Sequence, residues 1–342
     1  MPVLIGVLYD YPQDNSFFED ALRLGIATVQ HRLDREVELV VHQARGLPAG
    51  SAHEITRGFR ELDQAGCVAI IGPSISDNGI VVRDLADHAG LPCINYTGGA
   101  ITRSEFMFHY QVGSLEEEPA VLAEHLAGRG IQRVAVVHDR SPVGSQYAHW
   151  FELARATVGI EVTANAVINP LETEATDLVA RLEASKPDGL LYLGLGVAAR
   201  TVSLAVQALE WNVPVVANSA LMFGYAQREW REAWDGWVYI DTVSDDNASR
   251  RALSERDRAS AAGPVGVAAY DIGRLLGEAT IRGDHLTRDG IRDGLERVKR
   301  LPASSGHEGT TMGFGQWDRG ALKGSYLVLR EWRDGKTVQH GA

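Results

Sequence analysis

One pattern occurs twice in this chain and restricts its fold more than any other feature. The first copy is the apolar, β-branched run Val68–Ile71, which leads into the small polar segment Gly72–Ser76 and then a helix. The second copy is Val134–Asp139, which again leads into a short loop and a helix. In open parallel α/β sheets, ligands bind just outside the carboxyl ends of the strands. The two copies of the pattern therefore predict two such sheet edges that face each other across a cleft. A cleft of this kind favours ligand binding over catalysis.

Strand and helix patterns alternate through the first part of the sequence. Ser51 and Glu54 have the spacing of a capping box, and apolar residues at helical spacing follow them. The order β-α-β-α-β-α-β predicts parallel strands with right-handed crossovers. The expected strands are Val3–Leu8, Val37–Val41, Val68–Ile71 and Leu91–Tyr96.

The alternation restarts near residue 114. The expected strands of this second part are Val134–His138, Ile160–Val167, Leu190–Leu193, Val213–Ala217 and Trp237–Val243. The remaining helices, Val265–Ile281 and Thr287–Val298, and a hairpin at Trp332–Lys336 are too small for a core of their own. We therefore predict an α/β fold with two doubly wound parallel-sheet lobes. Residues 1–113 with 244–318 form the first lobe, and residues 114–243 with 319–342 form the second.

Composition and charge exclude two classes of function. The chain has 342 residues and a net charge of −12, so it lacks the basic surface of a nucleic-acid-binding protein. No apolar run is long enough to span a membrane. Val3–Leu8 is too short for a signal peptide and has no basic flank. We expect either a cytoplasmic protein or a mature or trimmed form of an exported one.

Neither cysteine indicates a disulfide framework or a metal site. Cys67 and Cys93 each begin an expected strand and are expected to be buried as small apolar side chains. A disulfide is the alternative, should the two strands be neighbours. No CxxC or HExxH spacing occurs, and we expect no metal.

The segment Gly194–Ala199 has the glycine spacing of a dinucleotide-binding turn. The expected strand after it runs into Asn218 and Ser219, where such a site needs an acid. We therefore interpret the segment as a tight turn and expect no cofactor. No GxSxG motif or nucleophile–base spacing occurs, and we do not expect an enzyme.

Candidate ligand-binding residues of the first lobe follow its strands. A hydroxyl group between a strand and a helix, beside free backbone N–H groups, is suited to hold a carboxylate. The alternatives are that Asp77 only caps the helix and that the tyrosines only pack on loops. The candidates are Tyr9, Tyr11, Ser74, Ser76, Asp77, Tyr96, Thr97 and Gly98.

In the second lobe, Met222 and Phe223 follow an expected strand and are candidates for the apolar wall of a pocket. Three tryptophans are expected to be buried against the sheet instead: Trp230, Trp234 and Trp237.

Several segments together resemble the type I periplasmic binding protein fold, most closely the leucine/isoleucine/valine-binding family of ABC-transporter solute receptors. They are Ile71–Ser76, Gly90–Thr97, Ala269–Ala279, Gly315–Gly324 and Asp334–Lys336. The resemblance covers nearly the whole chain. It implies two lobes joined by three crossovers, with a small-molecule ligand trapped by hinge closure. It also implies that Ser76 holds a ligand carboxylate and that Thr97–Gly99 binds through backbone carbonyl and hydroxyl groups.

The chain differs from this family where the other end of the ligand would bind. The resemblance implies a carboxylate after Val213–Ala217 that pairs with an α-ammonium group, and Ser219 stands there instead. Val143 and Gly196 stand where the family has aromatic residues. An unpaired buried ammonium group is costly. We therefore expect a small carboxylate without an ammonium group, or a neutral amide, against walls formed by Tyr96, Met222 and Phe223.

These observations predict a solute-binding protein that delivers a small carboxylate-type ligand to the permease subunits of an ABC importer. The ligand is expected to be an aromatic or aliphatic acid or an amino-acid derivative. The protein is then expected in the periplasm or at the extracellular surface. The alternative is a cytoplasmic, amide-responsive sensor of the same fold that acts through a protein partner.

Overall fold

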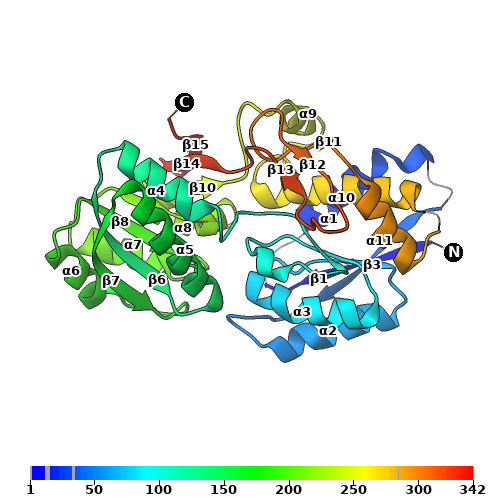
Figure 1. Ribbon diagram of the computed structural model, residues 1–342, viewed down its shortest axis with the longest axis horizontal. Coiled ribbons are helices and arrows are strands. Elements are labelled where there is room, and N and C mark those ends of the chain that lie inside the picture. The colour runs from blue at the N-terminus through cyan, green and yellow to red at the C-terminus, as the bar shows by residue number, and fades with distance from the viewer. Residues whose placement is uncertain (1, 12–15, 33–34, 284, 342) are drawn as a thin grey trace. The chain divides into compact units, whose positions relative to one another are not determined.

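The structure is a computed structural model that describes residues 2–11, 16–32, 35–283 and 285–341. It divides into two compact units (Figure 1). Unit 1 comprises Met1–Val112 with Thr242–Tyr326, and unit 2 comprises Gly113–Asp241 with Leu327–Ala342. The chain thus passes between the units three times, after Val112, Asp241 and Tyr326.

The third passage comes later than the sequence predicts. Residues 319–326 are expected in the second lobe, but the structure places them in unit 1. There, strand β13 (Leu322–Lys323) pairs with β12 (Thr311–Met312), and Gly320 bridges to His109. Strands of two residues have no readable hydrophobic period, so the sequence does not reveal this attachment.

Unit 1 contains a five-stranded sheet in the order β2-β1-β3-β4-β5. All of its neighbouring strands are parallel, as predicted. The strands are β1 (Val3–Tyr9), β2 (Val37–Gln43), β3 (Ala69–Ile71), β4 (Cys93–Asn95) and β5 (Met107–His109). The short β5 was not expected from the sequence. Because β1, β3 and β4 are parallel neighbours, their carboxyl ends meet at one edge of this sheet.

Helices cover both faces of the unit 1 sheet (Figure 1). Helices α2 (Ala52–Gln64) and α3 (Ser76–Ala89) lie on one face, and their apolar sides form a core with the strands. Helices α1 (Ser16–Ala27), α10 (Pro264–Arg282) and α11 (Arg288–Arg297) lie on the other face. The remaining elements are η1 (Gln30–Arg32), η2 (Ala100–Thr102), α9 (Ala248–Arg256) and β11 (Leu301–Pro302), which joins β12 and β13 in a small antiparallel sheet.

Several local predictions for unit 1 are confirmed. The Ser51 hydroxyl accepts a hydrogen bond from the Glu54 N–H and caps α2, as its spacing indicates. Cys67 and Cys93 are free and buried, so the disulfide alternative is wrong.

Helices α1 and α10 pack closely at Gly25, where an added Cβ atom would lie 2.2 Å from the Tyr270 carbonyl oxygen.

Unit 2 contains a seven-stranded sheet in the order β15-β14-β10-β9-β8-β6-β7. Strands β6 to β10 are parallel, and the hairpin β14–β15 joins the sheet antiparallel to β10. The strands are β6 (Arg133–Asp139), β7 (Glu161–Ile168), β8 (Gly189–Leu193), β9 (Val215–Ala217), β10 (Val238–Asp241), β14 (Val328–Arg333) and β15 (Lys336–Gln339).

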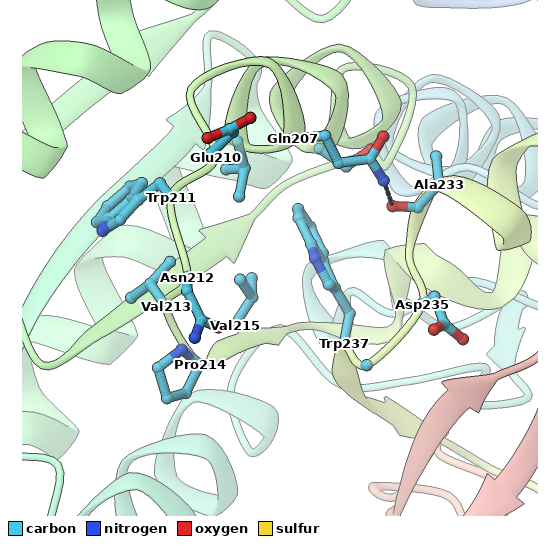
Figure 2. Close-up of a pocket in the computed structure, with 13 residues that line it drawn as sticks. Gln207, Glu210, Trp211, Asn212, Val213, Pro214, Val215, Ala233, Asp235 and Trp237 are labelled. Atoms are coloured by element: carbon cyan, nitrogen blue, oxygen red, sulfur yellow. Dashed lines mark hydrogen bonds between the residues drawn. The ribbon is translucent and has the colours of Figure 1, made fainter.

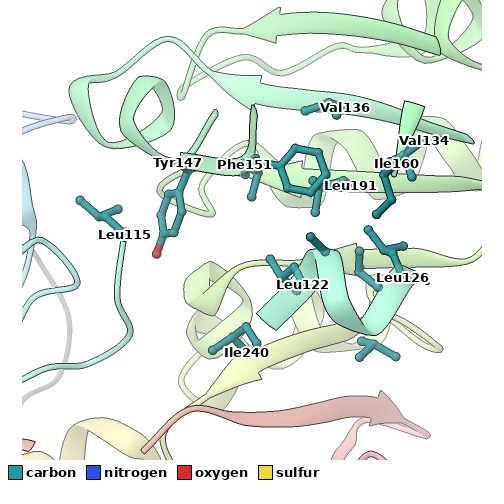
Figure 3. Packing of buried hydrophobic residues seen from close by; sticks show 14 of the residues in the cluster. Leu115, Leu122, Leu126, Val134, Val136, Tyr147, Phe151, Ile160, Leu191 and Ile240 are labelled. Carbon is teal, nitrogen blue, oxygen red and sulfur yellow. The ribbon is translucent and has the colours of Figure 1, made fainter. Parts of the chain in front are cut away.

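Apolar residues of helices α4 (Glu118–Gly128) and α5 (Pro142–Val158) pack on one face of this sheet and form its core (Figure 3). The other helices of unit 2 are α6 (Thr176–Ala184), α7 (Ala199–Ala208), η3 (Ser219–Tyr225) and α8 (Arg228–Ala233). Trp234 and Trp237 are buried, as expected, whereas Trp230 is partly exposed. The segment Gly194–Ala199 is the tight turn between β8 and α7 that the sequence indicates.

Candidate functional site

A buried carboxylate organises the carboxyl edge of the unit 1 sheet. Asp10 directly follows β1 and is 1% exposed. It accepts hydrogen bonds from the Ser74 N–H at 3.0 Å, the Ser74 hydroxyl at 2.6 Å, the Ile75 N–H at 3.0 Å and the Asn78 amide at 2.8 Å. Burial raises the pKa of Asp10, and these four donors act in the opposite direction. Asp10 therefore fixes the turn from which α3 starts.

Ser76 is the first residue of α3 and is 6% exposed. Its hydroxyl makes no hydrogen bond to any residue that the structure describes. The residue before the helix is Ile75, which provides no side-chain cap. The alternative in which Asp77 caps the helix is therefore wrong, because Asp77 lies inside the first turn. A hydroxyl group at the positive end of a 14-residue helix is suited to an anionic ligand atom.

The segment after β4 lies next to the Ser74 turn. The Tyr96 N–H donates to the Pro73 carbonyl at 3.1 Å, and the Tyr96 side chain is 4% exposed. Burial, together with the negative charge of Asp10, raises the pKa of Tyr96. Thr97 is 1% exposed, and the following Gly98 is partly exposed. The structure thus brings Ser74, Ser76 and Tyr96–Gly98 to one edge of the sheet.

Thr97 makes several hydrogen bonds within unit 1. Its hydroxyl donates to Asn95 Oδ1 at 2.9 Å, and its carbonyl accepts from His109 Nε2 at 2.7 Å and from the Val112 N–H at 2.9 Å. Burial lowers the pKa of His109 to about 3, so its ring is neutral at physiological pH. A ligand at Thr97 would therefore meet an acceptor oxygen, since the hydroxyl proton is directed to Asn95.

Aromatic rings line the end of β1. Tyr9 packs edge-on against Phe18 with a centroid distance of 5.8 Å, and Phe18 lies 4.8 Å from the ring of Tyr96. Burial raises the pKa of both Tyr9 and Tyr11. Phe18, which is not among the candidates predicted from the sequence, joins these rings from α1.

The corresponding edge of unit 2 is organised by Asp139 at the end of β6. Asp139 is 0% exposed and accepts hydrogen bonds from the Ser141 hydroxyl and the Leu195 N–H, both at 2.5 Å. Burial raises the pKa of Asp139. A Cβ atom on Gly194 would lie 2.2 Å from Asp139 Oδ2, so only glycine leaves space for this carboxylate. Asp139 thus joins the turns after β6 and β8, as Asp10 joins the turns of unit 1.

A second carboxylate of unit 2 lies beside Ser219. Glu118 is 0% exposed at the start of α4, and its Oε2 accepts from the Ser219 N–H at 2.7 Å. Its Oε1 accepts from the Ser114 N–H at 2.6 Å and from the Tyr147 hydroxyl at 3.0 Å. Burial raises the pKa of Glu118 from 4.5 to about 7. The sequence comparison concerned only the segment after β9, so it did not reveal this carboxylate, which comes from α4.

The other unit 2 candidates have different surroundings. Val143 is 6% exposed and belongs to the apolar core, one helical turn before Tyr147. Gly196 packs against η3, where an added Cβ atom would lie 2.6 Å from the Ala220 carbonyl oxygen. Met222 is 8% exposed, and the partly exposed Phe223 contacts the Trp230 ring at 5.8 Å.

A pocket of about 440 Å³ lies at the opposite edge of the unit 2 sheet, where β9 and β10 begin (Figure 2). Trp211, Pro214 and Trp237 line it together with the acidic residues Glu210 and Asp235. None of the predicted ligand-binding residues lines this pocket.

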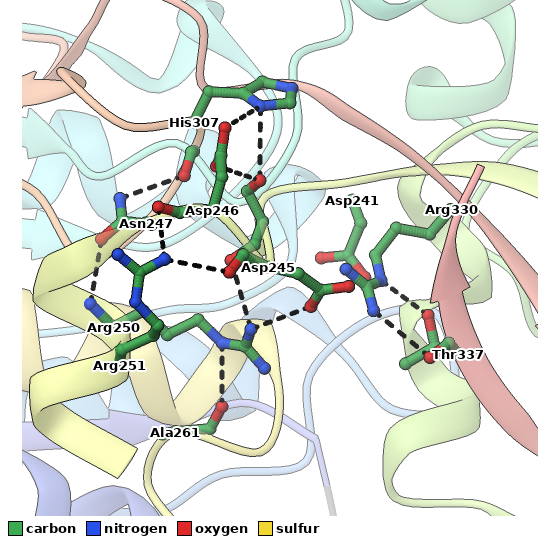
Figure 4. A network of polar contacts seen from close by, with 12 residues as sticks. Asp241, Asp245, Asp246, Asn247, Arg250, Arg251, Ala261, His307, Arg330 and Thr337 are labelled. Atoms are coloured by element: carbon green, nitrogen blue, oxygen red, sulfur yellow. Dashed lines mark hydrogen bonds and ion pairs between the residues drawn. The ribbon is translucent and has the colours of Figure 1, made fainter. Parts of the chain in front are cut away.

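Asp246 and His307 meet near the start of α9 in unit 1 (Figure 4), and Ser244 lies within hydrogen-bond distance of both. The Ser244 hydroxyl donates to Asp246 at 2.5 Å, and His307 Nδ1 contacts the same carboxylate at 3.1 Å. Asn247 caps α9 and donates to the carbonyl groups of Ala303 and Gly306. This cluster ties residues 244–247 to residues 303–308, and the serine proton points to the carboxylate rather than to a ring nitrogen that would activate it.

Two further features bear on function. Among the described residues, no helix has both the length and the apolar character that crossing a bilayer requires. Within the same residues, no group of three or more His, Cys, Asp or Glu side chains is placed to bind a metal ion.

Two α/β units joined by three passages of chain, each with polar residues gathered at the carboxyl edge of its sheet, define a ligand-binding protein of the periplasmic type. The family described as "Periplasmic binding protein" matches residues 3–328. The chain belongs to this family.

Solved structures show the same fold. A leucine-binding protein from Thermotoga maritima is 16% identical with a TM-score of 0.81, covering 99% of this chain and 98% of that one. A type 1 periplasmic binding protein from Bordetella pertussis is 17% identical with a TM-score of 0.83, covering 99% and 100%. An ABC transporter substrate-binding protein from Desulfitobacterium hafniense, in complex with Leu, is 20% identical with a TM-score of 0.81, covering 99% and 100%. No curated protein matches in sequence.

Proposed function

We propose that this chain is an extracytoplasmic solute-binding protein that delivers a small carboxylate-type ligand to the permease of an ABC importer. The ligand is an aliphatic or aromatic acid or an amino-acid derivative. In this proposal the three passages between the units serve as the hinge that closes on the ligand. Membership of the periplasmic binding protein family supports the binding and transport role.

The observation that carries the ligand class is the Ser76 hydroxyl. It lies at the amino end of a 14-residue helix and makes no hydrogen bond to any described part of the chain. A ligand carboxylate would accept a hydrogen bond from this hydroxyl and would be stabilised by the helix dipole. The partly exposed Gly98 and the buried rings of Tyr9 and Tyr96 supply further surface at the same edge.

A thermal-shift screen tests the proposal first. The probes are L-leucine, L-phenylalanine, 4-methylpentanoate, benzoate and the corresponding amides. A ligand at a hundred times its Kd stabilises the folded state by about 2.7 kcal/mol, which raises the melting temperature measurably. The proposal predicts that at least one carboxylate raises the melting temperature and that the corresponding compound without a carboxylate does so less.

Calorimetry on the best probe then tests Ser76. We expect Ser76→Ala to weaken binding by about 1–3 kcal/mol, because a charged group loses a hydrogen bond. The matched control is Ser203→Ala, whose buried hydroxyl donates to the Arg200 carbonyl of its own helix. Equal affinity of Ser76→Ala and the wild type would remove Ser76 from the site.

A further inference from the structure

The pocket where β9 and β10 begin, the β9–β10 pocket, forms because these two parallel strands separate there (Figure 2). The strands pair only from Val216 and Val238 onward. Before this pair, Pro214 has no N–H group that could extend the pairing. The Trp237 backbone N–H donates to the Trp234 carbonyl at 2.9 Å instead of to β9. The resulting volume of about 440 Å³ is within the range of small-molecule sites.

Two indole rings form apolar walls of this pocket. Trp237 is 5% exposed and Trp211 is partly exposed. In Figure 2, Glu210 lies on one side of Trp237 and Asp235 on the other. The Trp237 indole N–H makes no hydrogen bond to any residue that the structure describes, so it is available to an acceptor atom in the pocket. The faces of both rings attract cations.

The charged residues that line the pocket are all acidic. Its 13 lining residues, all of them described, include Glu210 and Asp235 but no Lys, Arg or His. Glu210 forms no ion pair with any described residue. Asp235 Oδ1 accepts from the Asp334 N–H at 2.7 Å. The Arg333 guanidinium, whose charge interacts with Asp235, is held by Glu331 at 2.9 Å. Glu210 and Asp235 Oδ2 can therefore bind a cation from the pocket.

Glu210 opposes two local preferences of the backbone. It follows α7, which ends with hydrogen bonds from the Glu210 N–H to the Gln207 carbonyl at 3.0 Å and from the Trp211 N–H to the Val206 carbonyl at 3.1 Å. Its φ of 51° is in the left-handed region that favours glycine. Its negative charge lies at the carboxyl end of a helix, where cations are favoured. Lys186 has the same φ at the equivalent position after α6 and is basic. A cation bound in the pocket would compensate the charge of Glu210.

We propose that the β9–β10 pocket binds a small organic cation: a primary ammonium group on an apolar body, with an oxygen atom beside it. The carboxylates of Glu210 and Asp235 attract the ammonium group, and the apolar body packs on the indole rings. The oxygen atom accepts a hydrogen bond from the Trp237 N–H. The pocket lies within unit 2, at the edge of the sheet opposite the strand ends, so this site is independent of the proposed function.

Fluorine NMR on the full chain labelled with 5-fluorotryptophan reports on the pocket, because Trp211 and Trp237 are two of the seven tryptophans. Trp211→Phe and Trp237→Phe assign their resonances. The first probe at pH 7.5 is 2-amino-1-phenylethanol, and 1-phenylethane-1,2-diol is its neutral counterpart. We expect the amino alcohol to shift both resonances saturably and to bind at least about fivefold more tightly than the diol.

Two further probes define the ligand class. 2-Phenylethylamine lacks the oxygen atom and should bind with an affinity between those of the amino alcohol and the diol. N-acetyl-L-lysine methylamide presents the cation as a protein side chain does, and it should bind more weakly than the amino alcohol. Tighter binding of the blocked lysine would overturn the assignment of a free small molecule.

Variants at the two carboxylates test the role of charge. Glu210→Gln/Asp235→Asn should weaken binding of the amino alcohol at least about threefold. The matched control Glu124→Gln/Glu229→Gln makes the same change in charge at two exposed residues outside the pocket and should retain the affinity. Glu210→Gly should weaken binding without lowering the melting temperature, because glycine suits the left-handed backbone. This variant separates a loss of binding from a loss of folding.

Three results would overturn the proposal: equal affinities for the amino alcohol and the diol, no shift of the Trp211 and Trp237 resonances, and an unchanged affinity in Glu210→Gln/Asp235→Asn. Ser76→Ala should bind the amino alcohol as the wild type does, because Ser76 belongs to unit 1. Weaker binding in Ser76→Ala would assign the probe to the other site and would also overturn the proposal. None of these results decides whether Ser76 holds a carboxylate.

Discussion

Glu118 should make the stability of unit 2 depend on pH, and the effect can be worked out from its burial. Burial raises its pKa from 4.5 to about 7 in the folded protein. Between these two values the folded state holds a proton that the unfolded state has released. The free energy of unfolding therefore falls as the pH rises through this range. Each pH unit between the two pKa values lowers the free energy of unfolding by about 1.4 kcal/mol, so the total loss of stability is about 3 kcal/mol by pH 8.

Urea unfolding of the wild type and of Glu118→Gln, followed by circular dichroism between pH 4.5 and 8.5, measures this loss. The variant also lacks one acceptor for the Ser114 and Ser219 N–H groups, which gives a constant difference at every pH. Other buried carboxylates, such as Asp10 and Asp139, are present in both proteins. Their contributions therefore cancel in the difference between the two free energies of unfolding. The difference in free energy of unfolding should therefore change by about 3 kcal/mol across the range. A difference that stays flat with pH would refute the reasoning, as would one that changes with the opposite sign.

Three further predictions follow from buried groups. Asp10→Ala should lower the free energy of unfolding by more than about 3 kcal/mol, because four donors lose their acceptor; urea unfolding measures this. Asp10→Glu serves as the control that retains the charge. A loss below about 1 kcal/mol in Asp10→Ala would contradict the role of Asp10 in fixing the turn before α3. Gly194→Ala should lower the melting temperature of unit 2 by several degrees, because its Cβ atom would lie 2.2 Å from Asp139; Gly128→Ala, where an added Cβ atom meets nothing within 4 Å, should not. Burial raises the pKa of Cys67 to about 11 and that of Cys93 still further, so neither thiol should react with a maleimide until urea unfolds the protein, and rapid labelling of the native chain would contradict this.

The sequence predicts the two α/β units because their parallel strands are continuous apolar runs, which burial on both faces of a sheet requires. It misses β5, a three-residue strand whose register depends on its pairing with β4. It also misplaces residues 319–326, because their attachment to unit 1 depends on two-residue strands that leave no local pattern. Long-range pairing determines both features.

The candidate site residues also differ in whether the local sequence reveals them or whether they depend on distant partners. The strand-end serine Ser76 is visible in the sequence because a strand, a small polar segment and a helix follow one another locally. Glu118 is not visible in this way, since it lies 101 residues before the Ser219 N–H to which it bonds. Asp10 has the same property, since it lies 64 residues before Ser74. A buried charge takes its role from its partners, and parallel sheets bring those partners from distant segments.

The most direct test of the central claim is a crystal structure with the probe that gives the largest thermal shift. We expect an oxygen atom of the ligand within about 3 Å of Ser76 Oγ, at the amino end of α3. A ligand bound elsewhere, with no ligand atom at the Ser76 hydroxyl, would contradict the proposed role of Ser76.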